Sequence, residues 1–143
     1  MKLLTLGLVL AALATPALAE DMTIEMLNKR DDGAKMVYSE DIARIELGDT
    51  ITWVPSDKGH NVEFIVGPME WDAPKKSKLS KEYSYTFDKE GVYLYQCTPH
   101  KTMGMIGIVV VGTTTDEHNM HMIHDAKVRG KSKKKLKELL EDL

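Results

Sequence analysis

The chain has 143 residues, of which 43% are hydrophobic and 29% charged, and its formal net charge is −3 with neutral histidines. This size and composition are typical of one globular domain and exclude a collagen-like or a strongly disordered chain. A mildly acidic balance disfavours a general nucleic-acid binder. The single cysteine excludes both an internal disulfide framework and a zinc site built from four cysteines.

Residues 1–19 have the pattern of a secretory signal peptide: Lys2, a mostly apolar run over 3–13, and an A-x-A sequence ending at Ala19. The alternative is an N-terminal membrane anchor, which needs a longer apolar run to span about 30 Å of hydrocarbon. We therefore expect cleavage after Ala19 and export of residues 20–143 to a bacterial periplasm, without membrane insertion. The loss of Lys2 makes the net charge of the mature chain −4.

Short alternating or β-branched runs, separated by turn residues, fill the chain from Asp21 to Gly112. Several short strands within about 90 residues favour an antiparallel Greek-key sandwich. In the run Tyr83–Phe87, aromatic residues alternate with hydroxyl residues, so the two kinds should face opposite sides of a sheet. The expected strands are Met22–Leu27, Ala34–Tyr38, Ile42–Leu47, Thr50–Val54, Asn61–Ile65, Tyr83–Phe87, Gly91–Cys97 and Ile106–Val111.

The pattern changes after Gly112, where the segment 116–127 contains few strand-forming residues. In Lys133–Leu143 the spacing of the leucines places four of them on one face of a helix. These are Leu136, Leu139, Leu140 and Leu143. Ser132 is a candidate N-cap for that helix. We expect two short helices within 115–143, folded back onto the sandwich in a single domain.

Metal-binding side chains are concentrated in the loop Cys97–Met105, between two expected strands. The loop carries a thiol, the imidazole of His100 and two thioethers. Thiolate and thioether donors favour Cu(I), and imidazole suits both copper states, whereas structural zinc sites do not use thioethers. His60, in a turn beside a much earlier strand, supplies a second imidazole. The alternative for Cys97 is a buried, inert thiol in an oxidising compartment.

The sequence C-T-P-H-x-x-M-G-M at 97–105, with G-H-N-V-E at 59–63, resembles the cupredoxins and most closely the pseudoazurin family. The segment 48–55 is also similar to the family, and the two-helix tail separates pseudoazurins from plastocyanins and amicyanins. This resemblance covers essentially the whole mature chain. It implies a mainly β fold, an eight-stranded Greek-key sandwich with two C-terminal helices. It also implies one mononuclear type 1 copper per chain that alternates between Cu(I) and Cu(II).

By the same resemblance, the copper ligands are His60, Cys97, His100 and Met105. Met103 would be the axial ligand in the shorter loop of amicyanins, but the tail and the flanking sequence favour Met105.

Three neighbours of the ligands also receive roles. By the resemblance, Asn61 would tie the strand of His60 to the ligand loop by bonding Thr98, whereas the alternative is an ordinary strand residue. By its own chemistry, Pro99 removes a backbone N–H donor beside the copper site, whereas the alternative is an ordinary turn proline.

The resemblance implies outer-sphere electron transfer through the edge of His100, within an apolar ring that here comprises Met36, Pro55, Pro99 and Met103. From the residues alone, Met36 would be a core-facing strand residue. Lysines near the copper end would orient acidic redox partners. They are Lys58, Lys75, Lys76, Lys78, Lys81 and Lys101. The alternative is a solvated loop, because acidic residues interrupt the series.

The function implied is that of a monomeric periplasmic electron carrier and not an enzyme. Its donors would be c-type cytochromes or the cytochrome bc1 complex, and its acceptors nitrite or nitrous oxide reductase. The alternative is a copper-trafficking or storage protein, supported only by His118, His121 and His124 with the methionines between them. A copper oxidase would need further histidine motifs and a longer chain.

Besides the lysines near the copper end, basic residues are concentrated in the tail, where the segment 127–137 has seven basic and no acidic residues. Nucleic acid and anionic lipid are the partners that such a run would favour. On a short helix with a leucine face, we expect instead a solvated outer side.

Overall fold

The computed structural model describes residues 18–113 and 119–143. Most of the expected signal peptide, as well as His118, therefore lies outside the described residues. In the described part of the chain, no helix is long and apolar enough to cross a membrane. The elements in order are β1 (Asp21–Lys29), β2 (Lys35–Tyr38), β3 (Ile42–Ile45), β4 (Thr50–Val54), β5 (Glu63–Val66), β6 (Tyr83–Thr86), β7 (Gly91–Gln96), the 3-10 turn η1 (Thr98–His100), β8 (Ile106–Val111), α1 (Met120–His124) and α2 (Ser132–Glu141).

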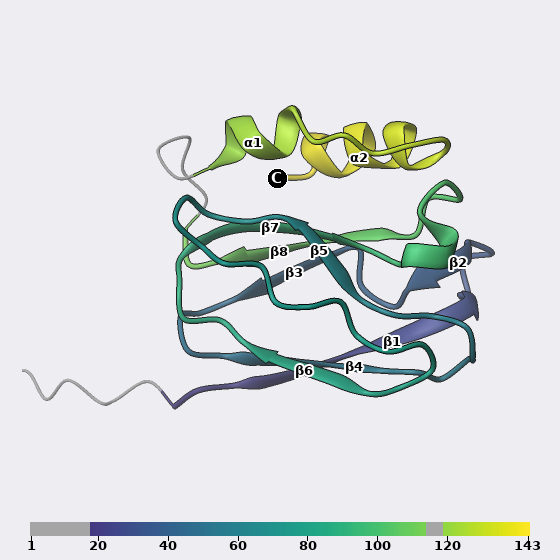
Figure 1. The fold of residues 1–143 in the computed structure, drawn as a ribbon, viewed down its shortest axis with the longest axis horizontal. Coiled ribbons are helices and arrows are strands. Elements are labelled where there is room, and N and C mark those ends of the chain that lie inside the picture. Colours follow the sequence, from purple (N-terminus) through teal and green to yellow (C-terminus); the bar gives the residue numbers. More distant parts are fainter. Residues whose placement is uncertain (1–17, 114–118) are drawn as a thin grey trace, which may run out of the picture.

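The eight strands form two packed sheets of four, with strand orders β2-β1-β4-β6 and β3-β8-β7-β5 (Figure 1). All eight expected strands are present, with ends that differ by at most two residues. The expected antiparallel pairing is wrong at two places, because β1 pairs parallel with β4 and β3 pairs parallel with β8. Parallel neighbours arise in a sandwich when a chain crosses from one sheet to the other between paired strands.

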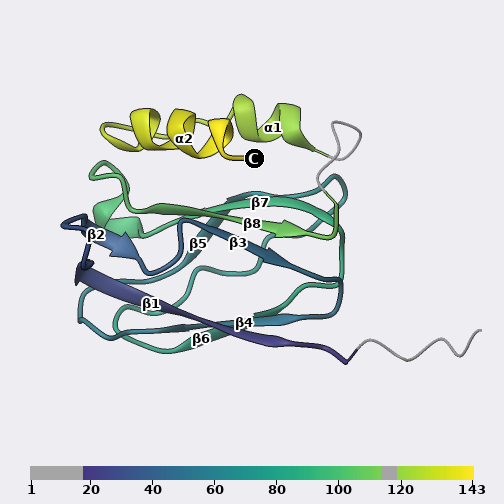
Figure 2. The same cartoon turned by 180° about the vertical axis from the view of Figure 1, so that it is seen from behind.

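Strands β7 and β8 are buried on both faces, which explains their nearly continuous apolar sequences. One face, including Tyr93 and Val109, packs into the core between the two sheets. The other, including Leu94 and Ile108, packs against the helical tail. Figures 1 and 2 show α1 and α2 lying across the outer side of the β3-β8-β7-β5 sheet. The tail is therefore a third layer of the domain.

The alternation of β6 is confirmed on the opposite sheet. Ser84 and Thr86 are exposed, and their hydroxyls bond Thr52 and Thr50 at 2.7 and 2.8 Å, whereas the tyrosines between them face inward. These hydroxyl pairs form a polar outer surface on a strand pair whose other side is core.

The tail differs from expectation at both ends of α2. Ser132 is not the N-cap: it is the first helical residue, it is buried, and its hydroxyl donates to the carbonyl of Lys101 at 2.7 Å. Helix α2 ends at Glu141, before the last leucine of the pattern. The leucine face is confirmed, because Leu136 and Leu139 are buried against the sheet.

Candidate metal centre

Three donor atoms from two separate segments converge at one end of the sandwich. The Sγ of Cys97 lies 3.7 Å from Nδ1 of His60 and 3.4 Å from Nδ1 of His100, and the two Nδ1 atoms are 3.1 Å apart. The pairing of β5 with β7 places Glu63 opposite Gln96, which brings the turn that holds His60 beside the residues after β7. Sheet register therefore assembles this group from positions 37 residues apart.

His60 is fully buried and its ring is oriented by Asn28. Its Nε2 lies 2.9 Å from Oδ1 of Asn28 at the end of β1. Because that oxygen only accepts, Nε2 carries the proton and the lone pair of Nδ1 points toward Cys97 and His100. Burial, followed by the nearby His100, lowers the pKa of His60 and favours its neutral form. A neutral imidazole is the form that binds a metal.

Cys97 follows the last residue of β7 and is completely buried. Burial raises the pKa of its thiol, against smaller effects of backbone hydrogen bonds at Asn61 and His100. A thiolate at this position therefore needs a positive charge beside it, and a bound metal ion supplies one.

A hydrogen-bond network holds the two ligand segments together. The backbone N–H of Thr98 donates to Oδ1 of Asn61 at 2.8 Å, and Nδ2 of Asn61 donates to the hydroxyl of Thr98 at 3.0 Å. The same hydroxyl donates to Glu63, which also accepts a bond from Gln96. The expected bond between Asn61 and Thr98 is thus present, and Asn61 is a buried linking residue.

The ligand loop has a compact backbone. The N–H of His100 donates to the carbonyl of Cys97 at 3.1 Å across η1, and Pro99 stands in the first turn without an N–H to donate. At the other end, the N–H of Cys97 donates to the carbonyl of Met105 at 3.0 Å. Met105 is fully buried, whereas Met103 is 45% exposed. The two thioethers therefore differ sharply in their access to water.

The donor set fits a single metal ion. Around one ion at trigonal angles, with bonds of about 2.0 Å to nitrogen and about 2.3 Å to sulfur, donor atoms lie about 3.5 to 3.7 Å apart. The distances among His60, Cys97 and His100 are close to these values. Two imidazoles and a thiolate are the equatorial ligands of blue-copper electron-transfer sites.

Of the residues expected to form the apolar ring, two methionines meet in one surface pocket. Met36 and Met103 line one surface pocket of about 200 Å³. Pro55 is half-buried and Pro99 is exposed. Lys58 is exposed in the turn after β4, and Lys76 is exposed in a loop that Ser77 ties to Val62 at the start of β5. Lys58 is therefore two residues from His60 in the sequence, and Lys76 is next to a residue that bonds the segment after His60.

Sequence reasoning missed several contributors to this region. Asn28 had no signal, because only the fold brings β1 to His60. Glu63 is the last residue of the G-H-N-V-E sequence, but no function was expected of its carboxylate, which accepts a bond from Thr98. Lys35, Lys131 and Lys134 also line the pocket of Met36 and Met103, although two of them belong to the tail.

The histidines of the tail form no comparable site in the described part of the chain. The one cluster of three or more His, Cys, Asp or Glu donors found among these residues is His60, Cys97 and His100. His121 and His124 are exposed on α1. The support expected for a copper-storage function is therefore limited to two exposed imidazoles.

Comparison with known proteins points to a family of copper-binding proteins. The family model described as copper binding proteins, plastocyanin/azurin family, matches residues 24–112. A pseudoazurin from Paracoccus pantotrophus is 40% identical over 128 residues, which cover 89% of this chain and 86% of the relative.

Solved structures separate two branches of that family. The crystal structure of native pseudoazurin from Hyphomicrobium denitrificans matches with a TM-score of 0.78 and 37% identity, covering 87% of this chain and 98% of the other. A solved amicyanin matches with a TM-score of 0.51 and 33% identity, covering 68% of this chain and 87% of the other. The match to pseudoazurin covers 87% of this chain, whereas residues 1–112 make up less than four fifths of it. The match to pseudoazurin therefore includes part of the helical tail.

Proposed function

This chain belongs to the plastocyanin/azurin family of copper-binding proteins and, within it, to the pseudoazurins, and we propose that it carries single electrons through one copper ion held by His60, Cys97, His100 and Met105. The observation that carries the proposal is the convergence of the first three donors at 3.1 to 3.7 Å. Buried Met105, joined through its carbonyl to the N–H of Cys97, supports its choice as the axial ligand. The protein is an electron carrier and not an enzyme.

Copper in this site supplies a one-electron couple between Cu(I) and Cu(II). The protein contributes a fixed arrangement of donors: Asn28 orients His60, and Asn61 with Thr98 holds the two ligand segments together. Hydrogen bonds of this kind around the ligands limit their movement and tune the metal. Burial of Cys97 and His60 keeps water from the sulfur, whereas His100 is only half-buried. Its partly exposed edge is the route by which an electron leaves.

The partners that we propose are soluble or membrane redox proteins that dock briefly at the exposed edge of His100. The acceptors are nitrite or nitrous oxide reductase, and the donors are c-type cytochromes or the cytochrome bc1 complex. Met36 and Met103 with their flanking pocket provide a small apolar contact surface. Small interfaces of this kind are typical of weak redox encounters. The proposed docking patch comprises Met36, Pro55, Pro99, Met103, Lys58 and Lys76.

We also propose a periplasmic location for a monomeric mature chain. The support is the signal-peptide pattern that ends at Ala19. In this compartment the single cysteine would be protected from oxidation by its burial and by the metal. Mass spectrometry of the protein exported by a bacterial host would show whether the mature chain begins at Glu20.

The test of the electron-carrier function is a visible absorption spectrum of the mature protein with one equivalent of Cu(II). We expect an intense charge-transfer band from thiolate to copper that ascorbate bleaches reversibly and that Cys97→Ser abolishes. The matched control is the double variant His121→Gln/His124→Gln, which should keep the band because these side chains lie on α1. A weak, broad spectrum with a titratable thiol would show that Cys97 is not a ligand and would refute the proposal.

A further inference from the structure

We propose that the face formed by α1, α2 and the segment between them binds the surface of an anionic phospholipid bilayer. This site would be peripheral and distinct from the metal centre. It uses the basic residues of the tail that neither the copper site nor the docking patch requires.

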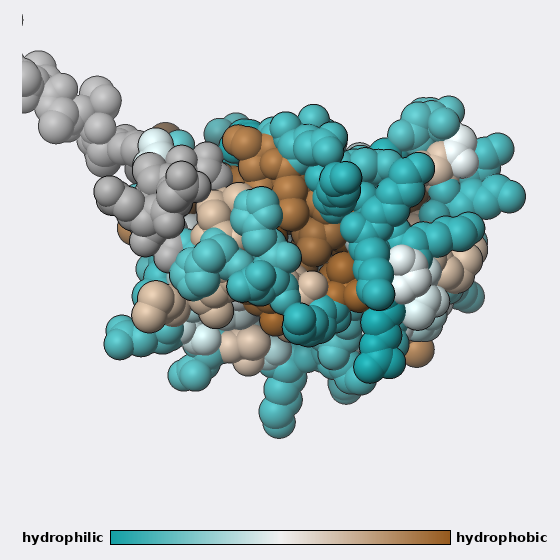
Figure 3. Space-filling model, turned by 90° about the horizontal axis from the view of Figure 1, so that it is seen from above, coloured by the Kyte–Doolittle hydropathy of each residue, from teal (hydrophilic) through white to brown (hydrophobic). Residues whose placement is uncertain are grey.

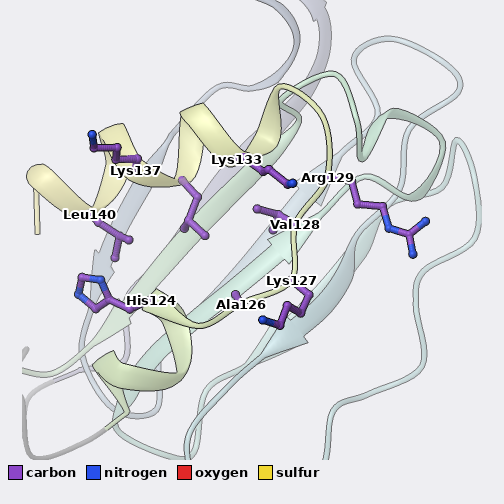
Figure 4. Close-up of a pocket in the computed structure, with 9 residues that line it drawn as sticks. His124, Ala126, Lys127, Val128, Arg129, Lys133, Lys137 and Leu140 are labelled. Carbon is purple, nitrogen blue, oxygen red and sulfur yellow. The ribbon is translucent and has the colours of Figure 1, made fainter.

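The face contains a groove of about 570 Å³ with an apolar floor and a cationic rim. Its floor is made by Ala126, Val128, Leu136 and Leu140, and Figure 3 shows a hydrophobic strip on this side of the molecule between hydrophilic flanks. The rim is made by His124, Lys127, Arg129, Lys133 and Lys137, all of them exposed. Figure 4 shows these side chains coming from both helices and from the segment that joins them. None of the lining residues is acidic.

The charge of this segment is opposite to that of the rest of the chain. Residues 127–137 contain seven basic and no acidic side chains. Four of them, Lys127, Arg129, Lys133 and Lys137, line the groove, and removing these four from the 19 basic residues leaves 15 against 22 acidic ones, a net charge of −7. An anionic surface therefore repels most of the protein and attracts this face, which fixes the orientation of the bound molecule.

The lysines of α2 divide between two sides of the helix. Lys135 pairs with Asp41 at 2.7 Å, and Lys134 pairs with Glu138 at 3.6 Å, on the side that faces the methionine pocket. Lys133 and Lys137 lie on the groove side, and no ion pair is found for either among the described residues. Their charges are free to meet phosphate groups.

The combination of cations with an apolar strip favours a lipid surface over an acidic protein segment. Basic clusters on amphipathic helices are attracted to anionic lipids, and apolar residues between the charges add contact with the acyl boundary. The long stems of Lys133 and Lys137 can lie along that strip while their charges reach the headgroups.

The position of the groove leaves the metal edge accessible. The N-terminal turn of α2 is joined to the ligand loop, because the N–H of Lys131 donates to the carbonyl of Thr102 at 2.9 Å and Ser132 bonds Lys101. The lipid-facing side and the edge of His100 are therefore neighbouring but separate surfaces. A membrane-bound molecule would therefore keep the edge of His100 accessible to a redox partner.

The experiment is sedimentation of the full mature protein with vesicles of mixed phosphatidylglycerol and phosphatidylcholine, and with vesicles of phosphatidylcholine alone. We expect binding only to the mixed vesicles, weakening as salt is added. Each cation near an anionic surface contributes a factor of about five to binding. The triple variant Arg129→Gln/Lys133→Gln/Lys137→Gln should therefore reduce the partition coefficient by about a hundredfold.

The matched control is Lys75→Gln/Lys78→Gln/Lys81→Gln, which makes the same change of net charge in another exposed loop. It should bind mixed vesicles within about twofold of the parent protein, and circular dichroism should show that both triple variants are folded. Equal loss in the two variants, or equal binding to both kinds of vesicle, would overturn the proposal. Binding to soluble polyglutamate without binding to the mixed vesicles would overturn the proposal and identify an acidic protein as the occupant. All of these measurements are independent of copper, so they can fail while the copper band is retained.

Discussion

Met103 and Met105 are two residues apart, but they have opposite environments. Met105 is fully buried immediately before β8, whereas Met103 is 45% exposed and lines a pocket with Met36. The sequence alone allows either thioether to complete the copper site. Burial separates them, because a weak axial ligand acts only from inside the closed pocket and an exposed thioether is available to a docking partner.

Substitution of each methionine by leucine tests this assignment. Met105→Leu should keep a thiolate-to-copper band but raise the reduction potential by about 60 mV or more, since a tenfold change in a one-electron equilibrium is 59 mV. Met103→Leu, the matched control, should leave the potential and the spectrum nearly unchanged. Voltammetry and visible absorption on the two variants provide the measurement. The reverse pattern would assign the axial position to Met103.

At the scale of elements, Asp41 joins three parts of the chain. Its carboxylate accepts hydrogen bonds from Arg30 after β1, at 3.1 and 3.2 Å, and from Lys135 of α2 at 2.7 Å. Burial raises the pKa of Asp41, but the bonds from Arg30 and Lys135 outweigh it and hold the pKa below its usual value. Arg30 also lowers the pKa of Asp32 to about 2. Both carboxylates are therefore more acidic in the folded chain than in the unfolded one.

This difference predicts a loss of stability in acid. A carboxylate with a lowered folded-state pKa stabilises the protein above about pH 4, and the contribution disappears as the pH falls through the folded-state value. Asp41→Asn should reduce the free energy of unfolding by about 1 to 2 kcal/mol at pH 7 and by much less below pH 3. Urea unfolding at the two pH values measures it. Asp72→Asn, at an exposed position, is the control and should change little; a pH-independent effect of Asp41→Asn would contradict the linkage.

Helix α2 also shows how local pattern and tertiary contact combine. Its leucine spacing predicted a helix with one apolar face, and Leu136 and Leu139 are buried on β7 and β8 as expected. The role of Ser132 was wrong because its hydroxyl is bound by a carbonyl of the ligand loop, 31 residues away. A capping residue can be recognised from sequence only when no distant partner competes for its side chain.

At the scale of the whole molecule, basic residues occupy two separate surfaces. One is the proposed docking patch with Lys58 and Lys76, and the other is the rim of the tail groove with Lys133 and Lys137. Salt screens the field of an exposed charge beyond about 10 Å at moderate ionic strength. Charges on different faces therefore influence the binding of different partners. If both proposals hold, the encounters with a redox partner and with an anionic surface should be independent of each other.

Charge reversal on each surface should affect one encounter and spare the other. Lys58→Glu/Lys76→Glu should slow electron transfer to nitrite reductase by about tenfold at low salt, because attraction to an acidic partner becomes repulsion. Lys133→Glu/Lys137→Glu, with the same change of net charge, should slow it by less than about twofold. Stopped-flow bleaching or recovery of the copper band, measured across ionic strength, gives the rates. Equal slowing by both pairs would mean that net charge, and not a docking patch, governs the reaction.

Much of this molecule follows from patterns that are local in the sequence. The strands could be predicted because short alternating or continuous apolar runs bounded by turn residues are typical of strands. The ligand loop could be predicted because a thiol, an imidazole and two thioethers lie within nine residues. The parallel pairings β1–β4 and β3–β8 could not, because they depend on how the chain crosses between sheets. Local patterning specifies an element but not its neighbour.

The donor types, the resemblance to a family and the two helices of the tail could all be predicted from local sequence patterns. Which donors meet, and what surrounds them, depends on tertiary contacts: Asn28 bonds His60, the hydroxyl of Thr98 bonds Glu63, and Met105 is buried while Met103 is exposed. Tertiary packing also brings apolar and basic residues of the tail together around one groove. The physical reason is that these properties arise between residues distant in the chain, where packing and sheet register set distances that no local spacing encodes.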